Sequence, residues 1–187
     1  VPSSWYEFFD AAAVPGFFTA HACDTVVIKP TIGANAQDTF VLNNPVDDAL
    51  VEHLARVFKS QRFFVQPFID NIQTEGEYSL FFFNGEYSHA ILKTPEAGDF
   101  RVQEEHGAAI NACTPPETLL RIANEVFARI QPLPLYGRGD WVRGSDGRFL
   151  LMELELIEPS LYLRTDRDAA TRFAVAFDQR FKELAGK

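Results

Sequence analysis

The pattern of apolar and polar residues predicts mostly short strands joined by tight turns. Seven runs have the length and the β-branched or aromatic content of strands: Thr25–Pro30, Thr39–Leu42, Arg62–Ile69, Tyr78–Phe83, Tyr87–Lys93, Leu135–Val142 and Arg148–Ile157. Asn84-Gly85 and Asp146-Gly147 each separate two of these runs, and such dipeptides are typical of hairpin turns. We therefore expect largely antiparallel sheets.

Apolar residues at helical spacing predict helices between these strands. The four predicted helices and their signals are Trp5–Ala12, broken by Pro15-Gly16; a helix capped by Asn44 with Pro45 first, running to Phe58; one behind a capping box at Thr114–Glu117; and a last one capped by Thr165–Asp168, with Phe173, Phe177 and Phe181 on one face. Hairpins outnumber crossovers, so the fold class is α+β with helices flanking the sheets.

Length, charge and cysteine content argue against several classes of function. The 187 residues suit one domain or two small lobes. The net charge of −9 argues against nucleic acid as a partner, and no apolar run approaches the length that a bilayer needs. Cys23 and Cys113 stand far apart, which predicts neither a disulfide framework nor a zinc site and favours a cytoplasmic protein.

Three carboxylates are the strongest chemical signal. Glu153 and Glu155 are two residues apart in a predicted strand and therefore share a face, and Asp140 ends the strand that pairs with it. Neighbouring carboxylates repel each other, and a divalent cation with a preference for oxygen ligands, such as Mg²⁺, relieves that repulsion. The alternative is a solvated acidic face. Arg138 shares the face of Asp140 and is expected to hold the acids by ion pairs.

Two cations are candidates for binding an anion. Lys29 ends an apolar strand before the polar loop Thr31–Asp38, whose backbone N–H groups can face a phosphate. Arg101 can grip a phosphate or a carboxylate with its forked guanidinium. The alternatives are an edge lysine that discourages aggregation and a surface ion pair of Arg101 with Glu104 or Glu105.

The chain resembles the ATP-grasp superfamily on its glutathione synthetase-like side, and within it the O-ureido-D-serine cyclo-ligase-like ligases. Four stretches carry the resemblance, in order along the chain: Val27–Gly33, Val65–Ile69, Glu75–Leu80 with Gly85–Ala90, and Leu151–Pro159. The resemblance implies two lobes of mainly antiparallel sheet, a small lobe at residues 1–68 and a large lobe at 69–187. It also implies an N-terminal domain that this sequence does not include.

The resemblance further implies a role for each matched residue. Lys29 would be a catalytic residue that binds the ATP phosphates, and the loop with Gly33 and Asn35 would cover these phosphates. The backbone of Gln66, Pro67, Phe68 and Ile69 would read the adenine edge. Glu77 would meet the ribose, Lys93 would face the nucleotide, and Arg101 would be catalytic at the transferred phosphate or acyl group. Asp140, Glu153 and Glu155 would hold Mg²⁺.

The implied activity is ATP-dependent ligation of a carboxylate to an amine or a thiol through an acyl phosphate, with ATP and Mg²⁺ as cofactors. The partners would be small carboxylate and amine substrates and the chain's own N-terminal domain, with a homodimer as an open option. Two other functions remain open at this point: a kinase of the same fold that acts on a small hydroxyl substrate, and a non-catalytic nucleotide-binding or interaction module.

Overall fold

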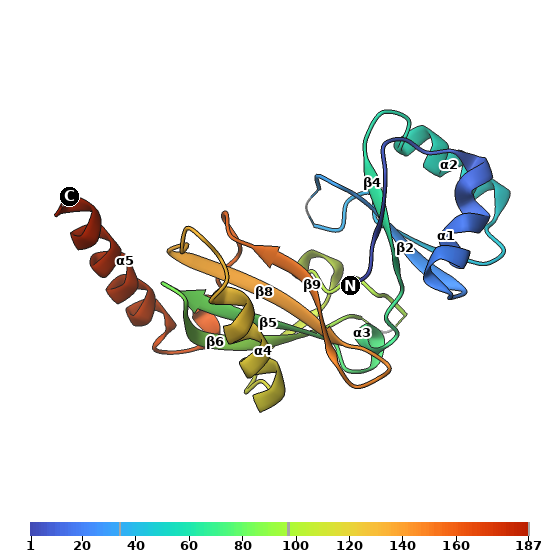
Figure 1. The fold of residues 1–187 in the computed structure, drawn as a ribbon. Coiled ribbons are helices and arrows are strands. Elements are labelled where there is room, and N and C mark those ends of the chain that lie inside the picture. The colour runs from blue at the N-terminus through green and yellow to red at the C-terminus, as the bar shows by residue number, and fades with distance from the viewer. Residues whose placement is uncertain (34, 97, 187) are drawn as a thin grey trace. The chain divides into compact units, whose positions relative to one another are not determined.

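The chain divides into two units, each built around its own antiparallel sheet. The computed structural model describes residues 1–33, 35–96 and 98–186, and the units are Val1–Ile69 and Asp70–Lys187 (Figure 1). The predicted α+β class with two mainly antiparallel sheets and flanking helices is confirmed. Among the described residues, no helix has the length and apolar character to cross a membrane.

The first unit is a four-stranded sheet with two helices on one face. The strand order is β1-β4-β2-β3, with bounds β1 Ser4–Tyr6, β2 Thr25–Pro30, β3 Phe40–Asn43 and β4 Phe63–Pro67. Val26 and Ile28 alternate along β2 toward one face, where they pack with residues of α1 (Val14–His21) and α2 (Asp48–Val57). The other face of β2 carries Lys29.

The second unit is a five-stranded sheet whose two faces differ in character. The strand order is β7-β6-β5-β8-β9, with bounds β5 Glu77–Phe83, β6 Glu86–Thr94, β7 Ala109–Ala112, β8 Tyr136–Arg143 and β9 Phe149–Glu155. One face packs under α4 (Glu117–Phe127), with Leu80 and Trp141 in the apolar cluster. Alternation along β5 and β8 then turns Ser79 and Asp140 to the opposite face, which is polar.

The short α3 (Asn71–Thr74) opens this unit, and the long α5 (Ala169–Ala185) closes it. Phe173 of α5 lies against Phe83, with ring centroids 5.2 Å apart. Further along the same helix, Phe177 and Phe181 are 54% and 61% exposed. The predicted phenylalanine face is therefore only partly used for packing among the described residues.

The helix predicted at Trp5–Ala12 is wrong. Ser4–Tyr6 form β1, where Trp5 is the register partner of Phe64, and aromatic residues suit such a pleated surface. The helix starts later, at Val14, and Pro15-Gly16 lie inside it rather than breaking it. Proline in the first helical turn loses no intrahelical hydrogen bond, which explains why it starts a helix here.

The predicted helix caps were also misplaced by a few residues. Asp47, not Asn44, caps α2, and its carboxylate accepts from the N–H of Ala49 and Leu50. The helix predicted behind the Thr114–Glu117 box begins at Glu117 without a side-chain cap bond. The last helix begins at Ala169, after a short 3₁₀ turn that contains Thr165.

Candidate functional site

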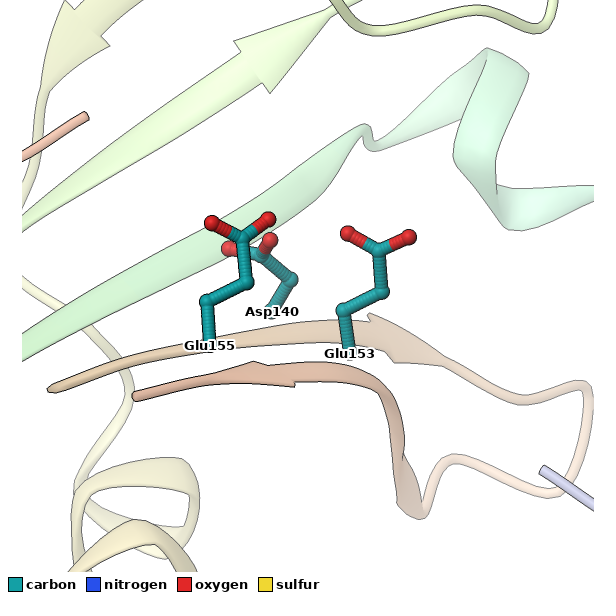
Figure 2. Close-up of side chains that lie close together, drawn as sticks. All are labelled: Asp140, Glu153 and Glu155. Atoms are coloured by element: carbon teal, nitrogen blue, oxygen red, sulfur yellow. The ribbon is translucent and has the colours of Figure 1, made fainter. Parts of the chain in front are cut away.

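Asp140, Glu153 and Glu155 converge on the polar face of the second sheet. Asp140 lies on β8 directly opposite Glu153 of β9, and Arg138 lies opposite Glu155. Ligand oxygens of the three carboxylates lie within 4.8 Å of one another, and the side chains rise from the strands to the same side (Figure 2). The register of one hairpin is therefore enough to assemble three acids from two short segments.

Asp140 is the buried centre of this group, with 1% of its surface exposed. Its carboxylate accepts hydrogen bonds from Ser79 Oγ at 2.5 Å and from Arg138 Nε at 3.1 Å, and Lys93 Nζ lies 3.5 Å away. Burial by itself would raise the pKa of Asp140, but Lys93 and Arg138 outweigh that effect and hold the pKa below its ordinary value. Asp140 is therefore a permanent anion at neutral pH.

Glu77 and Lys93 form a second buried pair beside it. They are register partners on β5 and β6, and Lys93 Nζ donates to Glu77 Oε1 at 3.0 Å. Burial raises the pKa of Glu77 to about 7; Lys93 opposes the rise, while Asp140 and Glu153 add to it. Burial would lower the pKa of Lys93, but Asp140 and Glu77 keep it above its ordinary value. Glu77 thus gives up its negative charge more readily than an ordinary glutamate.

The buried charges of this face are matched by ion pairs. Glu77 and Asp140 are paired with Lys93 and Arg138, and Arg138 also pairs with Glu155, which is partly exposed. The carboxylate cluster itself offers only oxygen donors, which are the donors that Mg²⁺ prefers. The donor set therefore fits a divalent cation.

Arg101, the remaining predicted residue of this unit, forms a partly exposed ion pair. Arg101 forms an ion pair with Asp99 at 2.7 Å, and that pairing holds the pKa of Asp99 well below its usual range. The alternative of a surface ion pair is correct in kind but not in partner: Arg101 pairs with Asp99, and Glu104 pairs with Arg164. The side chain of Arg101 stays 39% exposed, so it can exchange Asp99 for another anion.

In the first unit, Lys29 ends β2 on the face opposite the apolar core and is half-buried. The loop after it contains three non-glycine residues in the left-handed region: Asn35, Ala36 and Asp38. Such residues cost free energy and are enriched where a loop must present its backbone in a particular way. Gly33 is required by a close approach, because a Cβ there would lie 2.9 Å from Pro30 Cγ. Ala34 of the loop lies outside the described residues.

The predicted adenine-reading stretch is the end of β4. Gln66 is 6% exposed; its Nε2 donates to Ser3 Oγ at 2.9 Å, while its Oε1 is buried with no hydrogen-bond partner among the described residues. Pro67 has no N–H to offer, and the N–H of Phe68 already donates to Thr25 O at 3.0 Å. Ile69 is the last residue of the unit. A buried acceptor without a donor is costly and marks a place for a ligand donor.

Ser79 was missed by the sequence interpretation, although its signal was present. It lies two residues after Glu77 on β5 and therefore on the same polar face, opposite Asp140 in the register of β5 and β8. The expected ion pairs of Arg138 are confirmed. The guanidinium reaches Asp140 Oδ2 at 3.0 Å and Glu155 Oε1 at 2.5 Å.

Comparison with known proteins identifies the family of this chain. The family model described as the prokaryotic glutathione synthetase ATP-grasp domain matches residues 10–139. The chain belongs to this ATP-grasp family. The match stops one residue before Asp140, so the carboxylate cluster rests on the register and distances given above and not on the family model.

Individual relatives extend the similarity over nearly the whole chain. The cycloserine biosynthesis protein DcsG of Streptomyces lavendulae is 32% identical over 187 residues, covering 91% of this chain and 60% of that protein. The crystal structure of D-cycloserine synthetase DcsG has a TM-score of 0.83 at 31% identity and covers 96% of this chain and 64% of that one. The chain thus spans less than two thirds of the length of these relatives.

More distant structures share the fold. A D-alanine–D-alanine ligase from Bacillus anthracis in complex with ATP has a TM-score of 0.63 at 19% identity, covering 95% of this chain and 57% of the ligase. The ATP-grasp ligase PsnB in complex with a minimal precursor, Mg and ADP has a TM-score of 0.64 at 15% identity, covering 95% of this chain and 52% of PsnB. The predicted ATP-grasp family and fold are confirmed.

Proposed function

We propose that this chain is the nucleotide-binding catalytic region of an ATP-dependent ligase that joins a carboxylate to an amine, with a thiol as the alternative nucleophile. The observation that carries the proposal is the cluster of Asp140, Glu153 and Glu155 beside the buried Glu77–Lys93 pair. The names of its relatives support it, since they include a D-cycloserine synthetase and two ATP-grasp ligases, one bound to ATP and one to Mg and ADP.

In the second unit, Asp140, Glu153 and Glu155 would hold Mg²⁺. Bound there, the ion would neutralise negative charge on a transferred phosphoryl group. Lys93, fixed by Glu77 and Asp140, would present a positive charge that needs no reorganisation when the nucleotide arrives. Glu77 would also accept hydrogen bonds from the ribose hydroxyl groups. Arg101 would leave Asp99 to bind the transferred phosphate or the acyl group.

In the first unit, Lys29 would bind the ATP phosphates together with the loop that contains Gly33 and Asn35. The buried Oε1 of Gln66 is an acceptor suited to the exocyclic amine of adenine. Backbone groups of Pro67 and Ile69 would contribute to the adenine edge, whereas the N–H of Phe68 is engaged within the sheet.

The proposed reaction has two steps and passes through an acyl phosphate. A carboxylate oxygen of the substrate attacks the γ-phosphorus of ATP, the bond to the bridging oxygen breaks, and ADP leaves. The amine then attacks the acyl carbon, inorganic phosphate leaves, and the nitrogen loses a proton. The chain's contribution is positioning and positive charge around the transferred group.

Calorimetry with Mg·ATP tests nucleotide binding, with the Asp140→Asn chain as the matched control. We expect binding by the native chain and loss of binding by the variant. A folded native chain that binds no nucleotide, also when it is tested within a protein of the relatives' full length, would overturn the proposal.

Trapping with hydroxylamine tests the reaction class. When the chain is incubated with ATP, candidate carboxylic acids and hydroxylamine, we expect a hydroxamate. An acyl phosphate reacts with hydroxylamine, whereas a phosphate ester does not. ADP release with a phosphorylated hydroxyl compound and no hydroxamate would instead identify a kinase.

A further inference from the structure

We propose that Arg138 is a resident cation of the metal site, so that its guanidinium competes with a divalent ion for Asp140 and Glu155. The inference rests on the proposed function because it takes Asp140, Glu153 and Glu155 as the metal ligands. It adds to that function a competition between a side chain and the metal.

The first argument concerns the groups that already contact Asp140. Ser79 Oγ donates to Oδ1 at 2.5 Å, and the single Nε–H of Arg138 is shared between Oδ1 and Oδ2, each at 3.1 Å. Arg138 Nη2 and Lys93 Nζ add ion pairs at 3.0 and 3.5 Å. Both oxygens of Asp140 therefore face the guanidinium, and a metal ion that binds either of them meets its positive charge.

The second argument identifies Arg138, rather than Ser79 or Lys93, as the group that competes with the metal ion. Ser79 is neutral, and its bond to Asp140 is the shortest of the set. Lys93 is held at 3.0 Å by Glu77, which lies outside the carboxylate cluster. Arg138 alone among these donors also binds a second proposed ligand, Glu155, at 2.5 Å. The guanidinium and a metal ion would therefore occupy the same two carboxylates, and their positive charges repel each other.

The third argument is that Arg138 has another acceptor within reach. Its Nη1 lies 3.5 Å from the carbonyl oxygen of Ser160, in the segment that follows β9. The guanidinium can therefore turn away from Asp140 without losing all its hydrogen bonds. In the metal-free chain it holds mutually repelling carboxylates together, and it lowers the affinity of the site for a metal ion.

Titration of the 187-residue chain with Mn²⁺ alone, followed by calorimetry and by thermal unfolding, tests the competition. The variants are Arg138→Met and Arg138→Lys, and the matched control is Lys93→Met. The control removes the same charge from a side chain that also contacts Asp140 but has no bond to Glu155. We expect Arg138→Met to bind Mn²⁺ about tenfold more tightly than Lys93→Met does, the value of roughly one charge-assisted hydrogen bond.

Arg138→Lys guards against a folding failure, because it keeps the charge that compensates Asp140. It should still bind Mn²⁺ more tightly than the native chain, since an ammonium cannot bridge both carboxylates as a guanidinium does. Mn²⁺ should also raise the melting temperature of both Arg138 variants more than that of the native chain.

The outcomes separate the inference from the function on which it rests. Equal gains in Arg138→Met and Lys93→Met would mean a general effect of charge and would overturn the inference alone. Weaker Mn²⁺ binding in both Arg138 variants would overturn it as well, since the arginine would then assist the metal. If the native chain and every folded variant bind no Mn²⁺, both the inference and the proposed metal site are wrong.

Discussion

The two units prepare their proposed nucleotide residues in different ways. In the second unit, Asp140, Lys93 and Glu77 are buried and joined by ion pairs and hydrogen bonds across neighbouring strands. In the first unit, Lys29 is half-buried at the end of a strand, next to a loop with left-handed residues, and forms no salt bridge with another described residue. Stability and ligand binding should therefore depend on the same contacts in the second unit and on different ones in the first.

The largest effect should come from Asp140→Asn. The change leaves Arg138 and Lys93 facing an uncharged amide, and breaking a buried ion pair on one side typically costs about 3 to 5 kcal/mol. We expect the free energy of unfolding to fall by that amount and metal binding to be lost. Urea unfolding and Mn²⁺ titration measure the two.

Asp146→Asn is the matched control for this variant. Asp146 lies in the turn of the same hairpin, where its ion pair with Arg148 is exposed. Exposed pairs contribute little, so we expect this variant to be about as stable as the native chain. If the two variants were equally stable, the buried cluster would not contribute to stability as the comparison of units requires.

A pair of lysine variants sharpens the comparison directly. Lys93→Met leaves Glu77 and Asp140 without their shared cation, and we expect a loss of about 3 kcal/mol in the free energy of unfolding together with weaker ATP binding. Lys29→Met should weaken ATP binding by about tenfold or more, because one charge-assisted hydrogen bond is lost, and should leave stability nearly unchanged. Denaturation and nucleotide titration of both variants measure these effects. A Lys29→Met protein that is less stable than Lys93→Met would contradict the comparison of units.

Two glycine variants compare the space available for an added methyl group in each unit. A Cβ at Gly139, between Arg138 and Asp140, would lie 2.0 Å from the ring of Trp141. Overpacking of this kind costs about 1 to 3 kcal/mol, so Gly139→Ala should be destabilised. Gly16, inside α1 of the first unit, has open space where a Cβ would lie, with no neighbour within 4 Å, and Gly16→Ala should gain about 0.4 to 1 kcal/mol. Thermal unfolding of both variants measures the two effects, and a stabilised Gly139→Ala would show that the strand can shift.

The sequence predicted the second unit's site better than the first unit's N-terminal structure. Alternation along a strand and one Asp-Gly turn are local signals, and together they place Asp140 beside Glu153 and Glu155. Trp5 pairs with Phe64, which is distant in the sequence, so nothing local distinguishes its strand from a helix. The partner of Glu104 was missed for a similar reason, because Arg164 is distant from it in the sequence.

Burial of Glu77 makes the stability of the second unit depend on pH. The pKa of Glu77 is raised from 4.5 to about 7, chiefly by burial, so the folded chain binds this proton more tightly than the unfolded chain does. The stability from this proton is complete below about pH 4.5 and is lost as the pH rises through 7, with a slope of at most about 1.4 kcal/mol per pH unit. Unfolding of the metal-free chain between pH 5 and 7.5 should show this loss, and Glu77→Gln, which resembles the protonated acid, should not. His89 has a lowered pKa and contributes in the opposite direction, but it is present in both proteins and cancels in their difference. Parallel pH profiles for the two proteins would mean that Lys93 fully offsets the effect of burial and that the pKa of Glu77 is not raised in the folded chain.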